Sequence, residues 1–254
     1  MLAGVLPIRS TTNAGGTGCL RNQVCSENIL KTLIVNADDF GLTKSVNDAI
    51  IDTFRGGSVS STTLMVNTSA TEDAVQQAQL NSGLGVGLHF NLTLGKPVSP
   101  RDSVRSLVDD SGCFYSRGQL GRRLLMRRVQ RADVERELAA QYQRITTLGI
   151  KPTHIDSHQH VHGFPLCFNA VATLCSRNAL PMRVPWLLNI QHPRISPGRR
   201  VRQGLLRAML NHNRKRWSGR VRWNTGFASI FDLGTTPDTL DSSHYRALLA
   251  ASSA

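Results

Sequence analysis

Short apolar runs typical of buried strands alternate with helical patterns along much of this chain. The first three runs lie at residues 33–35, 59–66 and 84–90, and an apolar stripe at helical spacing follows each of the first two. A strand–helix repeat places parallel strands in a sheet whose faces are covered by helices. The pattern therefore predicts an α/β fold, either a barrel or an open doubly wound sheet.

The second half of the chain continues this alternation. A long helix is expected from one apolar face, followed by a strand at residues 153–157, a helix that Pro165 opens, and a strand at residues 182–186; the apolar face consists of Val134, Leu138, Tyr142 and Ile145. No GxGxxG or GxxxxGK[ST] segment follows any strand, which disfavours a nucleotide-binding doubly wound sheet. We expect a barrel, with catalytic groups at the carboxyl ends of its strands.

The ends of the chain and its composition limit where it acts. Residues 1–30 are rich in Gly, Thr and Asn without an apolar period, so we expect a disordered extension before one domain over residues 31–254. The early apolar patch has no basic residue ahead of it, unlike a signal peptide, and no apolar run approaches the roughly 20 residues that cross a bilayer. Five cysteines without a CxxC pair argue against a disulfide framework. We predict a cytoplasmic protein.

The formal net charge of +13 is concentrated in two arginine-rich segments, residues 117–131 and 194–222. Nucleic acid and an anionic membrane surface are therefore partners to consider, with nucleic acid less favoured. The second segment contains an apolar helical stripe that would suit peripheral contact with the inner membrane, although a core-packed helix with a solvated arginine face is favoured; the stripe consists of Val201, Leu205, Leu206 and Leu210. A homo-oligomer is a further option.

The densest ionisable group follows the predicted fourth strand. Five side chains occupy every second position, so an extended segment would turn them all to one side; they are His154, Asp156, His158, His160 and His162. Burying so many imidazoles is costly unless a metal, a carboxylate or water satisfies them. The pattern favours a ligand cluster over its alternative, a solvated histidine-rich loop.

Two other strand ends carry weaker candidates. In a strand the adjacent Asp38 and Asp39 would point to opposite sides, so that one could ligate a metal while the other reaches toward substrate. An Asp-Asp pair is just as common in a surface turn. His89 follows an apolar run and, taken alone, is more often a structural histidine.

Three motifs in order carry a family resemblance. They are residues 36–41 (Asn-Ala-Asp-Asp-Phe-Gly), 87–93 (Gly-Leu-His-Phe-Asn-Leu-Thr) and 153–162 (Thr-His-Ile-Asp-Ser-His-Gln-His-Val-His), and residues 183–185 (Arg-Val-Pro) follow them. From about residue 31 to residue 231 the chain resembles the YdjC-like carbohydrate deacetylases, and its arginine-rich remainder resembles the branch associated with hopanoid biosynthesis. The resemblance implies a deformed (β/α) barrel of the glycoside hydrolase/deacetylase type. It also implies metal-dependent hydrolysis of an N-acetylated amino sugar, carried on a hopanoid glycolipid in that branch.

By motif position, the resemblance makes Asp39, His89 and His158 the metal ligands and Asp38 the catalytic base. Arg183 is expected to pair with Asp38 and keep it ionised, although a simple surface ion pair would explain Arg183 equally well. The candidates for substrate contact or support of the ligands are His160, His162 and Asn91. The resemblance implies Mg²⁺, whereas two imidazoles and a carboxylate suit Zn²⁺.

The chain departs from this family after Phe231. Members continue into further strands, one with a His-Pro motif that supplies a general acid, whereas His192-Pro193 here lies between basic segments. We therefore expect a barrel truncated at its C-terminus, with weak or absent turnover. Two other functions stay open: a metal-dependent hydrolase of another bond such as a phosphoester, and a catalytically impaired basic protein that binds membrane or nucleic acid.

Overall fold

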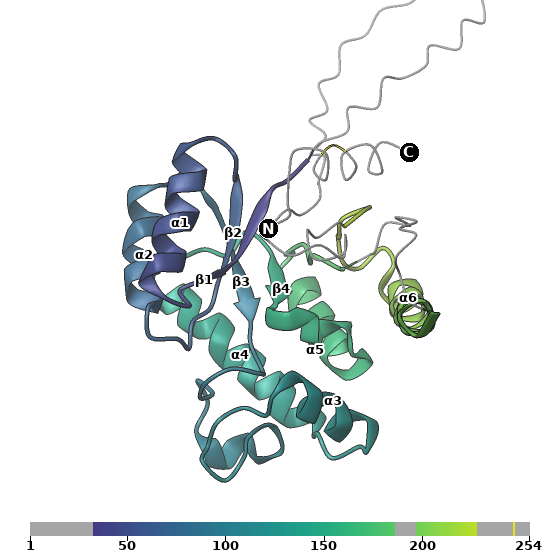
Figure 1. Cartoon of the computed structure of the whole chain (residues 1–254). Coiled ribbons are helices and arrows are strands. Elements are labelled where there is room, and N and C mark those ends of the chain that lie inside the picture. The colour runs from purple at the N-terminus through teal and green to yellow at the C-terminus, as the bar shows by residue number, and fades with distance from the viewer. Residues whose placement is uncertain (1–32, 186–196, 228–245, 247–254) are drawn as a thin grey trace, which may run out of the picture.

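The structure, a computed structural model, describes residues 33–185, 197–227 and 246 of the chain. The predicted N-terminal extension, His192-Pro193 and the residues around the predicted truncation lie outside this part. Four parallel strands form one sheet in the order β1-β2-β3-β4 (Figure 1), and they are β1 (Asn36–Phe40), β2 (Ser61–Leu64), β3 (Gly85–Phe90) and β4 (Ile155–Ser157). The prediction of a parallel α/β fold is confirmed.

The strands follow one another across the sheet in chain order. Strands in chain order are typical of a (β/α) barrel, whereas a doubly wound sheet reverses its order at a switch point; closure into a barrel stays a prediction. Single parallel bridges continue the arrangement from Ile155 to Met182 and from Met182 to Trp223. Of the strand expected at residues 182–186, the described residues 182–185 contain only the bridge at Met182.

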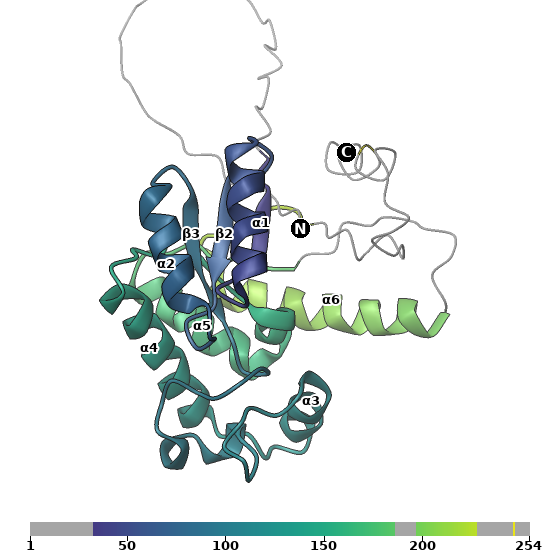
Figure 2. The same ribbon diagram turned by 60° about the vertical axis from the view of Figure 1, so that its left-hand side comes forward.

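The helices that follow the strands in the chain pack against the sheet in the same order. Helices α1 and α2 lie side by side along β1 and β2, while α4 packs against β3 and also contacts α5, which reaches α6 (Figures 1 and 2). These helices are α1 (Lys44–Arg55), α2 (Thr71–Leu80), α4 (Arg131–Thr147), α5 (Pro165–Arg177) and α6 (Pro197–Trp217). None of the helices in the described residues has the length and apolar content to span a membrane.

The local sequence explains most helix boundaries. The hydroxyl of Thr43 accepts a hydrogen bond from the Val46 N–H and caps α1. Thr71 is the first residue of α2, and its hydroxyl donates to the carbonyls of Met65 and Thr68. The sequence pattern does not predict α3 (Arg117–Leu125), which begins in a capping box formed by Ser116 and Gln119.

The core lies between the sheet and its helices. Val134, Leu138 and Ile145 are buried on one face of α4, as their spacing predicts, and Tyr142 is half-buried beside them. The fully buried large side chains include Phe40, Leu88, Phe90, Ile155 and Phe168. Each side chain of this size contributes about 1.5–3 kcal/mol to stability when it is fully buried. This packing fixes the strands whose carboxyl ends carry the candidate site.

Candidate metal centre

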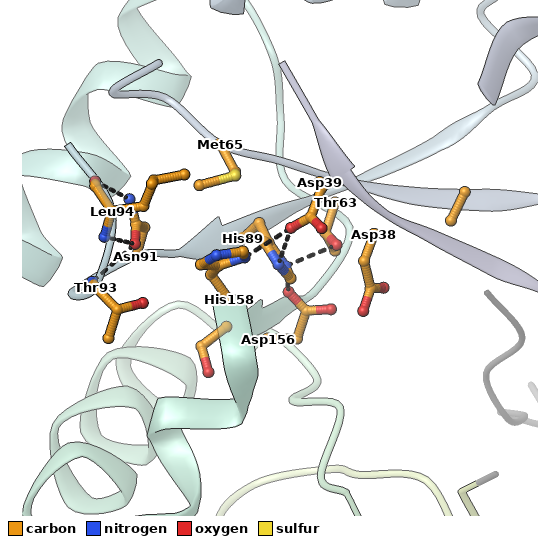
Figure 3. A network of polar contacts seen from close by, with 12 residues as sticks. Asp38, Asp39, Thr63, Met65, His89, Asn91, Thr93, Leu94, Asp156 and His158 are labelled. Carbon is orange, nitrogen blue, oxygen red and sulfur yellow. Dashed lines mark hydrogen bonds and ion pairs between the residues drawn. The ribbon is translucent and has the colours of Figure 1, made fainter. Parts of the chain in front are cut away.

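Asp39, His89 and His158 converge where β1, β3 and β4 end. Each offers one ligand atom that lies within 4.8 Å of the other two. Asp39 Oδ1 lies 3.1 Å from His89 Nε2 and 2.8 Å from His158 Nδ1. Figure 3 shows the three side chains facing one another from β1, from β3 and from the turn that follows β4. The structure thus brings together the three residues predicted as metal ligands.

The backbone of β1 explains how two adjacent carboxylates reach different partners. The register with β2 shifts between Ala37 and Phe40, and Asp39 has a φ of 66°, in the left-handed region. Such an irregularity re-aims side chains that would otherwise alternate strictly across the strand. Asp39 turns toward the two histidines, whereas Asp38 points elsewhere (Figure 3).

The turn that follows β1 holds this irregularity in place. Gly41 has a φ of +92°, and a Cβ there would come within 2.8 Å of the Met65 carbonyl oxygen. The Gly41 N–H donates to Asn47 Oδ1 at 2.7 Å, and the amide of Asn47 donates to the Ala70 carbonyl. Glycine is therefore required here both for its backbone conformation and for the space it leaves.

A buried carboxylate fixes the ring of His89. Asp156, in β4, is fully buried and its Oδ1 lies 2.6 Å from His89 Nδ1, where the Thr63 hydroxyl also lies 3.0 Å away. Burial alone would lower the pKa of His89, but the charge and hydrogen bond of Asp156 raise that pKa to about 10. A proton on Nδ1 directed at Asp156 leaves Nε2 as the nitrogen that faces Asp39.

Arg183 connects Asp156 with the second carboxylate of the pair. Its guanidinium, which is 8% exposed, lies 2.7 Å from Asp38 Oδ1 and also contacts Asp156 Oδ2. Asn36 donates to the same Asp38 oxygen at 2.7 Å. Burial opposes the charge of Arg183, but Asp156 and Asp38 raise the pKa of its guanidinium. The pairing is thus a buried interaction and not the surface ion pair that was its alternative.

Nearby opposite charges also lower the pKa of two carboxyl groups of the centre, Asp39 and Asp156. Burial would raise the pKa of Asp39, yet hydrogen bonds with His158 and His89 hold it well below its usual range. Burial likewise opposes ionisation of Asp156, but Arg183 and then His89 lower the pKa of that carboxyl. The centre is therefore a network in which each buried charge has an opposite charge within hydrogen-bonding distance.

The histidine-rich segment does not stay extended. β4 ends at Ser157, and the next residues form a 3₁₀ turn, η3 (His158–Gly163), in which Gln159 and His160 have left-handed backbones. The condition under which all five alternating side chains would share one side, an extended backbone, is therefore not met beyond Ser157. His158 contacts Asp39, whereas the buried His162 contacts the Ser157 hydroxyl.

The remaining candidates lie around the centre. The ring of His160 meets Phe227 edge-on with 5.4 Å between ring centroids, and the Arg183 guanidinium lies over the same Phe227 ring. Asn91 is fully buried in the loop after β3, where its side chain accepts from the backbone of Thr93 and Leu94 and donates to Leu94 and to Asn67. These bonds give Asn91 the role of shaping that loop.

The donor set fits a divalent cation. Two imidazole nitrogens and one carboxylate oxygen approach one another about as closely as ligand atoms do around a single ion. The second nitrogen of His89 is hydrogen-bonded to a carboxylate, the usual support for a metal-ligating histidine. Sequence reasoning named all three ligands but gave no role to Asp156, Asn36 or Thr63. Asp156 had a signal in its place in the alternating segment and Asn36 in its place in the first motif, whereas Thr63 had none.

Comparisons with known proteins agree with this geometry. The profile of the family described as YdjC-like protein matches residues 32–252, which is most of the chain. The chain belongs to the YdjC-like family. The family prediction is thereby confirmed, whereas the assignment to the hopanoid-associated branch stays a prediction.

Curated relatives of this YdjC-like protein carry deacetylase names. A carbohydrate deacetylase of Geobacillus stearothermophilus is 47% identical over 150 residues, which are 59% of this chain and 58% of the relative. A chitooligosaccharide deacetylase of Enterobacter sp. (strain 638) is 42% identical over 167 residues, 64% of this chain and 62% of the relative. The chain thus spans about three fifths of the length of the curated relatives that it matches.

The similarity to one solved structure concerns the fold and not the function. A protein of Enterococcus faecalis, provisionally named for cellobiose-phosphate cleavage, superposes with a TM-score of 0.57 at 24% identity and covers 86% of this chain and 94% of its own. The arrangement of parallel strands and helices in the YdjC-like protein is therefore shared with a known crystal structure.

Proposed function

We propose that this YdjC-like protein hydrolyses the N-acetyl group of an amino sugar with the help of a divalent cation. The observation that carries the proposal is the convergence of Asp39, His89 and His158 beside the buried Asp38–Arg183 pair. The names of the curated relatives, carbohydrate and chitooligosaccharide deacetylase, support the choice of reaction and substrate class.

The residues divide into a cation-binding group and a proton-accepting group. Asp39, His89 and His158 would hold the cation, which polarises the amide carbonyl and lowers the pKa of water. Asp38 accepts the proton of the water that attacks the acetyl carbon. Arg183 and Asn36 both bond Asp38 Oδ1, so the carboxylate is held in a fixed orientation.

Two neighbouring histidines complete the proposed site. His160 is half-buried against Phe227, whose ring the Arg183 guanidinium also contacts. His160 is therefore a better candidate than His162 for contact with the sugar. His162 is buried and bonded to Ser157, so it supports the turn that presents His158. Asn91 shapes the loop after β3 in the same supporting way.

The proposal also concerns which cation is bound and which molecule carries the N-acetylated sugar. Mg²⁺ follows from the family resemblance, whereas two nitrogen ligands and one oxygen ligand favour Zn²⁺ on chemical grounds. The resemblance to the hopanoid-associated branch extends the substrate to N-acetylglucosamine carried on a lipid. Both points rest on sequence and on ligand chemistry.

Acetate release tests site and reaction together. The protein is stripped with a chelator, reloaded with Mg²⁺ or Zn²⁺, and incubated with N-acetylglucosamine oligosaccharides or with a phosphomonoester. We expect cation-dependent acetate release, no phosphate release, and loss of acetate release in Asp38→Asn. Phosphate release without acetate release would replace the proposal with phosphoester hydrolysis, and turnover that survives complete removal of the cation would refute the metal role.

A further inference from the structure

The turn after α3 exposes two adjacent large hydrophobic side chains. Leu125 is 84% exposed and Met126 is 53% exposed, at the last residue of α3 and the residue after it. Exposed hydrophobic side chains scattered singly need no explanation, but two neighbours at a projecting helix end form a small apolar tip. We call residues 117–131, which contain this tip, the α3 turn.

Arginines surround the tip. Four of them are exposed and pair with no carboxylate among the described residues; they are Arg117, Arg122, Arg127 and Arg128. No acidic residue occurs between Asp110 and Asp133. The α3 turn is therefore strongly positive, and nothing within it neutralises that charge.

The exposure of the tip is built into the structure. The helix ends in backbone hydrogen bonds from the N–H groups of Met126, Arg127 and Arg128, and Arg127 has a left-handed backbone with a φ of 55°. On both sides of the tip the chain is anchored, because Leu120 and Val129 are buried in the core. Leu125 and Met126 are thus held outward by an ordered turn.

The combination of apolar tip and unpaired arginines matches one kind of surface. An anionic bilayer offers phosphates for the guanidinium groups and, just beneath them, an apolar layer for Leu125 and Met126. A nucleic acid would satisfy the arginines but would leave the two hydrophobic side chains in water. We propose that the α3 turn docks on the headgroup surface of an anionic bilayer, with Leu125 and Met126 inserted.

The position of the turn relates this surface to the metal centre. Figures 1 and 2 both show α3 beyond the carboxyl end of β3, the side of the sheet on which the metal centre lies. Docking there keeps that side toward the bilayer. If the proposed function holds, the substrate class that this arrangement fits is an N-acetylated sugar carried on a lipid.

The second basic region supplies an internal control. Leu210 of α6 is buried, so this member of the predicted membrane-binding stripe packs into the core; the side chains of Val201, Leu205 and Leu206 lie outside the described residues. Lys215 and Arg216 at the end of α6 are exposed but have no exposed hydrophobic neighbour in the described part of the chain. If charge alone governed binding to vesicles, substitutions in either basic region would weaken binding equally.

Vesicle sedimentation of the full chain tests the proposal. We expect retention by vesicles that contain phosphatidylglycerol and not by phosphatidylcholine alone. The double variant Leu125→Ser/Met126→Ser should bind about tenfold more weakly, and Arg127→Gln/Arg128→Gln should lose about fivefold for each arginine. The controls Leu80→Ser, at another exposed leucine, and Lys215→Gln/Arg216→Gln should bind like the wild type.

The outcomes separate this surface from the catalytic proposal. Thermal melting shows whether each variant is folded, and acetate release from a soluble oligosaccharide should be unchanged in all of them. Absence of vesicle binding, equal loss in the α6 control, or binding of RNA without vesicle binding would each overturn the membrane surface. None of these results depends on whether the protein is a deacetylase.

Discussion

The candidate metal centre and the α3 turn are two charged regions of this molecule, and they stabilise their charges differently. In the metal centre, Asp39 and Asp156 are partnered by histidine and arginine groups within hydrogen-bonding distance. In the α3 turn, four arginines are exposed and have no carboxylate partner among the described residues; they are Arg117, Arg122, Arg127 and Arg128. A change in the first region should therefore disturb its neighbours, whereas a change in the second should stay local.

The largest effect expected is on turnover. Asp38→Asn keeps the size of the side chain but removes the proposed proton acceptor, so kcat should fall by a factor of about 10²–10⁴. The proposed cation ligands are other residues, and cation affinity measured by calorimetry should change little. A variant that keeps most of its acetate release would show that another group accepts the proton.

Asp156→Asn should have the next largest effect because it breaks the connection between the two halves of the centre. Arg183 and His89 would each lose a buried opposite charge, and removing one partner of such a pair costs about 3–5 kcal/mol of unfolding free energy. At a pH above the pKa of His89, where no proton competes for the ring, cation affinity should also fall by about 10–100-fold, because the His89 ring is less firmly oriented.

An exposed carboxylate gives the matched control for that variant. Asp102 pairs with Arg105 on the surface, with both side chains mostly exposed. Asp102→Asn should change the free energy of unfolding by no more than about 0.5 kcal/mol. Denaturant titration of both variants measures the contrast, and equal losses would mean that burial does not distinguish the two regions.

The protonation of His89 predicts how cation binding depends on pH. Asp156 raises the pKa of His89 to about 10, so the metal-free protein carries a proton that a cation at Nε2 must displace. Raising the pH removes this proton, so affinity should increase about tenfold per pH unit below that pKa and level off above it. Calorimetry in buffers of different ionisation enthalpy should detect proton release on binding, and an affinity independent of pH would contradict the assignment.

The sequence predicted the local features of this molecule better than its long-range contacts. The alternation of strands and helices and the strand-end positions of Asp39, His89 and His158 follow from periodicity and motif order. The sequence could not show that residues after Ser157 turn, because the left-handed backbones of Gln159 and His160 depend on packing around them. For the same reason it gave no role to Asp156, whose partners come from β3 and from beyond α5.

The smallest effect is expected where charge is exposed. In Arg127→Gln/Arg128→Gln the two guanidinium groups lose no partner carboxylate, so the free energy of unfolding should change by less than about 0.5 kcal/mol per residue and could even rise as repulsion is relieved. The rise, if present, should vanish at high salt, because salt screens charges at the surface. Denaturant titrations at low and high salt measure this. A loss comparable to that of Asp156→Asn would show that the arginines of the α3 turn are held by the fold itself, and the contrast between the two regions would fail.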